Sequence, residues 1–172
     1  MTPEEERVRS YLLGQANKLS IADLVAKVRE DCTALEGVGA AVPAGRFHDR
    51  PGDGEWSAAE VWTHVLDINE SGRRMITSAI ESGVIPERVS DTIAGGARTE
   101  LTTSGDYWAR YLEERELLLD RVSQARGDEH LEAKITHPQF GPFSWREWLL
   151  FMRVHDLDHL RQLQSIAAAL GN

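Results

Sequence analysis

Apolar residues recur at helical spacing along most of the chain, and this pattern predicts four long helices. Between residues 20 and 35 the apolar side chains fall three and four positions apart, which places them on one face of a helix. The same spacing runs through residues 58–82, 105–126 and 145–170. No segment alternates apolar and polar residues for long, so no β-sheet is predicted. We therefore expect an all-α protein.

Capping sequences indicate where several helices begin and end. Ser57 and Ser144 are each followed three positions later by glutamate, which is the capping-box arrangement at a helix start. Thr2 followed by Pro3 predicts a further helix at the N-terminus. Gly83 is expected to end its helix in the left-handed conformation that glycine adopts readily.

Three irregular stretches separate the predicted long helices: residues 37–55, 84–104 and 127–143. All of them contain glycine and proline or long runs without helical periodicity. Four long helices in 172 residues predict an up-down four-helix bundle. The length also predicts a single domain that spans residues 1–172.

The charge balance narrows the range of partners. The chain has 19 Lys and Arg residues against 28 Asp and Glu residues, which gives a formal net charge of −9. Nucleic acids and anionic membrane surfaces both attract basic faces, so this balance disfavours both partners. The longest strictly apolar runs have five residues, whereas a membrane span needs about 20. We expect neither a nucleic-acid nor a membrane partner.

The single cysteine limits the kinds of covalent and metal cross-link that the chain can form. Cys32 alone can form neither an intramolecular disulfide nor a cysteine-based zinc cage. The polar, acidic start of the chain does not resemble a secretory signal, and a reducing, cytoplasmic location fits best. Because Cys32 lies on the apolar face of its helix, a small buried side chain is favoured over a reactive thiol.

Two histidines lie on the apolar face of the last helix. His155 and His159 are four positions apart, so both rings project from one face. This spacing lets two imidazoles reach one metal ion; two hydrogen-bonded core histidines are the alternative. His64, at the margin of the apolar face of helix 58–82, is the natural third ligand. Three imidazoles would leave a fourth tetrahedral position for water or substrate.

Two longer motifs resemble the DinB superfamily of four-helix metalloproteins, also called the DinB/YfiT-like family. They are GEWSAAEVWTHVLDINE at residues 54–70 and HPQFGPFSWREWLLFMRVHDLDHLRQLQ at residues 137–164. In that family a Trp-Ser capping motif precedes the helix that bears the first metal histidine, which corresponds to His64. A final helix carries an HxxxH pair, which corresponds to His155 and His159. The resemblance implies a divalent metal, zinc or nickel above all, and a homodimer.

The resemblance also implies chemistry on low-molecular-weight thiols. Characterised branches of the family are mycothiol-dependent isomerases and bacillithiol-dependent or related S-transferases. The expected function is a metal-dependent transferase or hydrolase that acts on a small-molecule substrate, with a thiolate or water as the nucleophile. The alternative is a non-catalytic, stress-related protein that binds a metal or a small ligand.

Further residues are candidates for a substrate pocket. Arg115 falls near the centre of the core face of helix 105–126, where it pairs with a buried carboxylate or binds an anionic group of a substrate. Trp56 and Trp62 flank the first ligand helix and are candidates for the pocket wall. His137 lies near the expected pocket mouth, either as an ordinary loop histidine or as a proton shuttle. Candidate hydrogen-bond partners of the metal histidines are Glu60, Asp67, Asp156 and Asp158.

Overall fold

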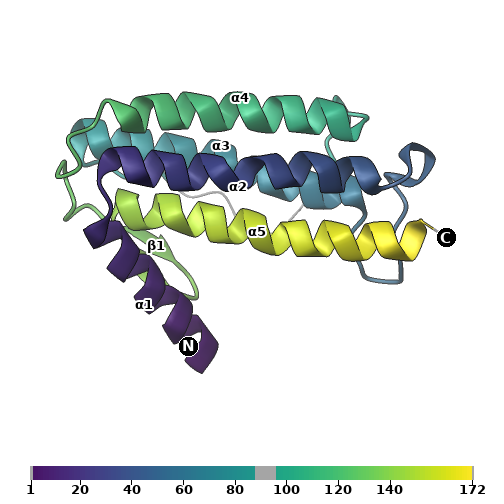
Figure 1. Cartoon of the computed structure of the whole chain (residues 1–172), viewed down its shortest axis with the longest axis horizontal. Coiled ribbons are helices and arrows are strands. Elements are labelled where there is room, and N and C mark those ends of the chain that lie inside the picture. The colour runs from purple at the N-terminus through teal and green to yellow at the C-terminus, as the bar shows by residue number, and fades with distance from the viewer. Residues whose placement is uncertain (1, 88–95, 172) are drawn as a thin grey trace.

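The computed structural model describes residues 2–87 and 96–171, and these residues are mostly helical (Figure 1). They form the helices α1 (Pro3–Lys18), α2 (Ile21–Ala41), α3 (Ala58–Ser82), α4 (Ser104–Ser123) and α5 (Trp145–Leu170). A short 3-10 helix, η1 (Ala44–Arg46), and two strands, β1 (Ile135–His137) and β2 (Gly141–Phe143), complete the described elements. The all-α prediction therefore holds apart from one small hairpin.

The helix ends follow the predicted capping chemistry. The Ser57 side chain accepts a hydrogen bond from the Glu60 N–H at 3.2 Å, and the Glu60 carboxylate accepts one from the Ser57 N–H at 2.8 Å. At the start of α5 the Glu147 carboxylate accepts from the Ser144 N–H at 2.6 Å. Gly83 ends α3 with φ +71°, in the left-handed region. These caps satisfy backbone groups that a helix end leaves without partners.

The four long helices lie side by side, and α1 projects from one end of them (Figure 1). Helix α3 packs against both α4 and α5, and α2 packs against the same two helices. Each long helix therefore buries its apolar face against two others, which is how helices of this length are stabilised.

Helices α3 and α4 run in the same direction, which contradicts the predicted up-down order. Thr63 near the start of α3 contacts Tyr107 near the start of α4, and Glu81 near the end of α3 pairs with Arg121 near the end of α4. Only short loops force consecutive helices to be antiparallel. The connection of residues 84–103 is long enough to return along a whole helix, and residues 88–95 within it lie outside the description.

Helix α2 continues beyond its predicted end at residue 35 and runs through Gly37 and Gly39 to Ala41. At Gly39 the backbone lies directly against the Trp62 indole, and an added Cβ would be 2.7 Å from the Trp62 Nε1. Glycine is a poor helix former, but here only glycine fits the contact. Tertiary packing thus overrides the local signal that predicted a loop.

The hairpin falls in the stretch 127–143, which the sequence predicts to be irregular. Its strands have three residues each, too few for an alternating pattern to be recognised. Two contacts join it to α1: the Arg9 Nε donates to the Phe140 carbonyl at 2.9 Å, and the Gln139 amide donates to Glu5 at 2.6 Å. The hairpin and α1 therefore form one unit beside the start of α5.

The core consists of two apolar clusters that a layer of buried polar side chains separates. One cluster joins α1, the hairpin and the start of α5 to the second halves of α3 and α4. The other joins the first halves of α3 and α4 to the second halves of α2 and α5. Between them along the helices lie Asn69, Arg115 and Asp156, each at most 5% exposed. We call these three residues the polar layer.

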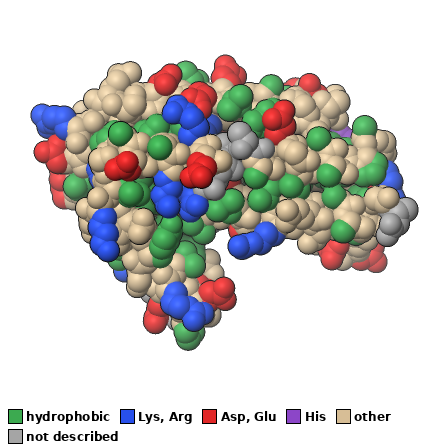
Figure 2. Space-filling model, in the orientation of Figure 1, with side chains coloured by type: hydrophobic (Ala, Val, Ile, Leu, Met, Phe, Trp, Pro, Cys, Tyr) green, Lys and Arg blue, Asp and Glu red, His purple; other side chains and the backbone are tan. Residues whose placement is uncertain are grey.

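The surface and the helices bear on the expectations about charge and membranes. On the face drawn in Figure 2, acidic and basic side chains are intermixed. Among the described residues, no helix combines the length and the apolar character that crossing a membrane requires. The side chains of residues 31–33 are outside the description, and the predicted burial of Cys32 with them.

The contact between Gly39 and Trp62 can be tested by a pair of substitutions in α2. Gly39→Ala should destabilise the protein by about 1–3 kcal/mol, because the buried indole blocks the added methyl group. Gly37→Ala should stabilise it by about 0.5–1 kcal/mol, since no other atom lies within 4 Å of the added Cβ. Urea unfolding of both variants measures the difference. Equal effects would contradict the close contact.

Candidate metal centre

Three histidines from two helices converge beside the polar layer. The Nε2 of His64, on α3, lies 3.0 Å from the Nε2 of His155, on α5. The His159 ring centroid lies 4.7 Å from that of His64 and 4.4 Å from that of His155. One ring nitrogen of each residue can be chosen so that all three lie within 4.8 Å of one another. The structure thus brings together the three residues predicted as metal ligands.

Hydrogen bonds orient two of the rings toward the centre of this histidine cluster. The Nδ1 of His155 lies 3.3 Å from Oδ1 of Asp156, and the Nδ1 of His159 lies 2.8 Å from Oε1 of Gln162. In the tautomer with the proton on Nδ1, each oxygen accepts a hydrogen bond from Nδ1 and the lone pair is on Nε2. Carboxylate or carbonyl partners of this kind are typical of metal-binding histidines.

The surroundings of His159 favour its neutral imidazole. Burial, together with the neighbouring His155, lowers the pKa of His159 to about 4. His64 is 6% exposed, and Trp56 covers it with a ring-centroid distance of 5.2 Å while stacking on His159. Neutral imidazole is the form that binds a metal, and zinc–nitrogen distances of about 2.0–2.1 Å suit nitrogens this close together. The donor set therefore fits a divalent cation.

Arg115 is buried in the polar layer beside the histidine cluster. Its side chain is fully buried, pairs with the Asp156 carboxylate and donates to Oδ1 of Asn69 at 2.5 Å. The Tyr111 hydroxyl also donates to Asp156, at 2.7 Å, and Asp156 in turn contacts His155. The prediction that Arg115 is buried and paired with an anion is confirmed. Its assignment to a substrate pocket stays a prediction, and neither of the two cavities beside the cluster has Arg115 in its wall.

Of the four predicted carboxylate partners, Asp156 is the one that contacts a ring of the cluster. Burial by itself raises the pKa of the Asp156 carboxyl, but Arg115 and the bonds from His155 and Tyr111 outweigh it and hold that pKa below its usual range. The other three carboxylates pair with arginines instead: Glu60 with Arg50, Asp67 with Arg98 and Asp158 with Arg161.

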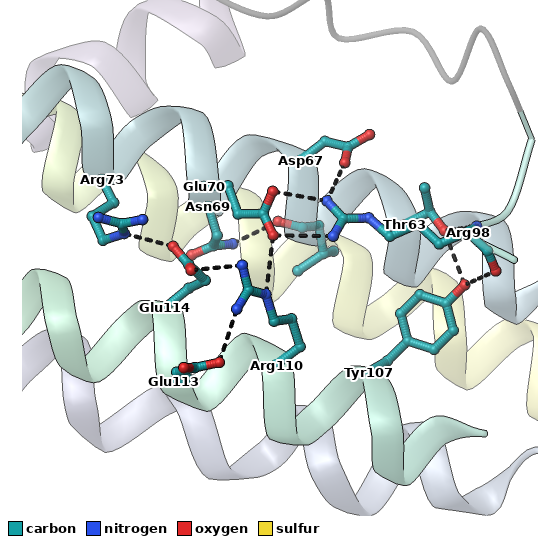
Figure 3. A network of polar contacts seen from close by, with 11 residues as sticks. Thr63, Asp67, Asn69, Glu70, Arg73, Arg98, Tyr107, Arg110, Glu113 and Glu114 are labelled. Atoms are coloured by element: carbon teal, nitrogen blue, oxygen red, sulfur yellow. Dashed lines mark hydrogen bonds and ion pairs between the residues drawn. The ribbon is translucent and has the colours of Figure 1, made fainter. Parts of the chain in front are cut away.

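A network of ion pairs clamps α3 to α4 and to the connection between them (Figure 3). Arg98 pairs with Asp67 at 2.5 Å and with Glu70 at 3.0 Å, and its backbone N–H donates to the Thr63 hydroxyl at 3.0 Å. Because Thr63 directly precedes His64, this clamp fixes the turn of α3 that carries the first histidine. Nothing in the sequence pattern singles out Arg98, since its partners lie on another element.

Two cavities flank the histidine cluster. The Trp56 cavity, of about 590 Å³, is lined by Trp56 and His159 together with Pro51, Gly54, Glu55, Gln162, Ser165, Ile166 and Ala169. The hairpin cavity, of about 440 Å³, has His64, His155 and His137 in its wall. Each of the three histidines thus lies in the wall of one of the two cavities, where a small molecule can reach it.

The two remaining pocket candidates have different outcomes. His137 lies in the wall of the hairpin cavity, as the last residue of β1 rather than in a loop. Trp62 is fully buried in the core against Tyr107 and Tyr111, and neither cavity has it in its wall. Trp56, the other flanking tryptophan, lines a cavity instead.

The buried ion pair gives a prediction about stability. Arg115→Met should cost about 3–5 kcal/mol, because it leaves the Asp156 charge in the core without its cation. Arg29→Met is the matched control, since the Arg29–Glu116 pair is exposed and should be worth at most about 1 kcal/mol. Urea unfolding at pH 7 compares the two variants. A loss for Arg115→Met no larger than for Arg29→Met would contradict the role given to the buried pair.

Comparison with known proteins shows the family of the chain. The DinB superfamily model matches residues 27–163, a range that includes all three histidines. The uncharacterized protein YuaE of Bacillus subtilis (strain 168) is 23% identical over 134 residues, which cover 70% of this chain and 83% of that protein. Because the family model covers well over half of the chain, the protein belongs to the DinB superfamily.

Proposed function

We propose that the protein is a divalent-metal-dependent enzyme in which His64, His155 and His159 hold the metal. The observation that carries the proposal is the convergence of three ring nitrogens within 4.8 Å of one another between two cavities. Imidazole ligands suit zinc and nickel, the two metals we favour. Three neutral ligands leave the double charge of such a cation uncompensated, which favours an anionic fourth ligand.

The reaction that we favour is S-transfer with a low-molecular-weight thiol as cosubstrate. When bound, a divalent cation supplies Lewis-acid activation of a thiol or a water molecule at its open position. The chain contributes the orientation of the rings through Asp156 and Gln162, and the Trp56 ring shields the cluster from bulk water. Membership of the family supports the thiol, because characterised branches use one. Hydrolysis by an activated water is the related alternative.

The proposed architecture is the four-helix bundle of the family, formed by α2–α5 within a single domain of residues 1–172. The mutual packing of the four helices supports it. We also propose a homodimer in the cytoplasm. The homodimer is proposed from the family alone. The abundance of aromatic residues adds no support, since Trp62, Trp145 and Trp148 are fully buried within one chain and need no partner to cover them.

Metal binding is tested by alanine substitution of the ligands. The wild-type protein should bind one Zn²⁺ or Ni²⁺ per chain. Replacing His64, His155 or His159 should weaken binding by more than the about 10–100-fold typical of losing a ligand's hydrogen-bond partner. His48→Ala is the control, because His48 is exposed and lies outside the cluster. Elemental analysis and calorimetric titration measure stoichiometry and affinity. Stoichiometric metal in the triple-alanine variant would exclude this site.

Catalysis is tested by a screen for thiol conjugation. Protein loaded with Zn²⁺ or Ni²⁺ should accelerate the reaction of a low-molecular-weight thiol with at least one small electrophile. Chelator treatment and His155→Ala should both abolish the acceleration, while His48→Ala should retain it. Product formation is followed by mass spectrometry. Tight metal binding without chelator-sensitive turnover would favour the non-catalytic, metal-binding alternative.

A further inference from the structure

His137 is held in one tautomer by the hairpin that carries it. Its Nδ1 accepts hydrogen bonds from the backbone N–H groups of Gln139 at 3.1 Å and Phe140 at 3.2 Å. A nitrogen that accepts two hydrogen bonds presents its lone pair and carries no proton. The neutral ring therefore carries its proton on Nε2, where it is a donor.

The orientation of this ring is fixed as well as its tautomer. His137 is 7% exposed, and its centroid lies 4.6 Å from that of Phe151 and 5.0 Å from that of Phe140. The hairpin itself is anchored on α1 through the Arg9–Phe140 and Gln139–Glu5 contacts. A buried, packed and anchored donor is preorganised, so the side chain loses little conformational entropy when a ligand binds to it.

The hairpin cavity supplies the rest of a binding site. His137 shares its wall with His64 and His155. Six further wall residues are apolar or aromatic: Val8, Ile68, Phe140, Trp148, Phe151 and Val154. The other four are polar or charged: Glu4, Gln139, Asp158 and Arg161. Figure 2 shows a concave angle on the side where α1 projects from the long helices. A cavity that combines an apolar and aromatic wall with polar groups suits a small ligand that has an apolar body and a polar group for His137 to bind.

We propose that the Nε2–H of His137 donates a hydrogen bond to a carbonyl or carboxylate oxygen of a substrate with an apolar or aromatic body bound in the hairpin cavity. The proposal rests on the proposed function, since it places this oxygen in the cavity that the candidate metal ligands share. It also excludes the proton-shuttle role for His137, because the backbone already occupies the lone pair that a base would use. His137 is a substrate-binding residue.

The tautomer is tested without any metal. Nitrogen-15 correlation spectra of the histidine side chains in the metal-free protein should show His137 protonated on Nε2 and not on Nδ1 at pH 7. Benzoate, a small aromatic carboxylate, should shift the Nε2 signal of His137 on titration. Toluene has the ring without the oxygens, cannot accept this hydrogen bond and should not produce the same shift. A proton on Nδ1 would overturn the proposal.

A conservative variant separates ligand binding from structural support. The amide oxygen of His137→Asn can replace Nδ1 as the acceptor of the two backbone N–H groups, but the variant has no group in the place of Nε2. It should fold but unfold at a somewhat lower temperature, because the buried ring is lost, and it should bind benzoate about 10–100-fold more weakly, the loss expected for one hydrogen bond to a charged group. His130→Asn, at an exposed histidine, is the control.

Zn²⁺ binding measured on the same variants keeps this proposal distinct from the proposed function. His137→Asn should bind Zn²⁺ like the wild type, because His137 is not among the three clustered histidines. Unchanged benzoate affinity in His137→Asn, or no benzoate binding by the wild type, would overturn the role of His137 whatever the metal result. Failure to bind Zn²⁺ with benzoate affinity still dependent on His137 would overturn only the metal-dependent function.

Discussion

The buried ion pair of Arg115 and Asp156 is the constraint on which the rest of the structure depends. A carboxylate in a protein core is tolerated only when charge and hydrogen bonds compensate it, and Asp156 receives both from α3 and α4. These contacts set the rotation of α5 about its own axis. Because His155 is the neighbour of Asp156 in the chain, the same rotation turns the histidine toward His64. The ion pair thus positions His155, one of the three candidate ligands.

The two apolar clusters give the polar layer its surroundings and limit water at the histidines. The burial of His159 keeps its imidazole neutral, which is also the state in which it can bind a cation. The clamp around Arg98 and the hairpin anchored on α1 hold the two flanks of the site. Two cavities adjoin the cluster, so the geometry gives small molecules two separate approaches to it.

Local signals in the sequence predicted the helices, their caps and the common face of His155 and His159, because periodicity and capping act within a few residues. His64 was added to them from the expected bundle and from the family resemblance. The HxxxH spacing of His155 and His159 fixes their common face whatever the rest of the fold does. Features that depend on distant contacts were missed. The parallel course of α3 and α4 depends on a connection without periodicity, and the length of α2 depends on the fit of Gly39 against Trp62. The partner of Arg115 and the choice of Trp56 over Trp62 for the cavity wall are likewise decided by tertiary packing.

The adjacency of His155 and Asp156 has a consequence for how such proteins diverge. One residue serves the candidate metal centre, while the next serves the core, about 100° further round the helix. Loss of the histidine removes a ligand and leaves the packing intact, whereas loss of the aspartate leaves a buried guanidinium without its counter-charge. Selection for folding alone is therefore enough to preserve Arg115 and Asp156, whereas preservation of His155 depends on the proposed metal chemistry. In a lineage that abandons the metal, the arginine–aspartate pair is the part of the site that drift erases last.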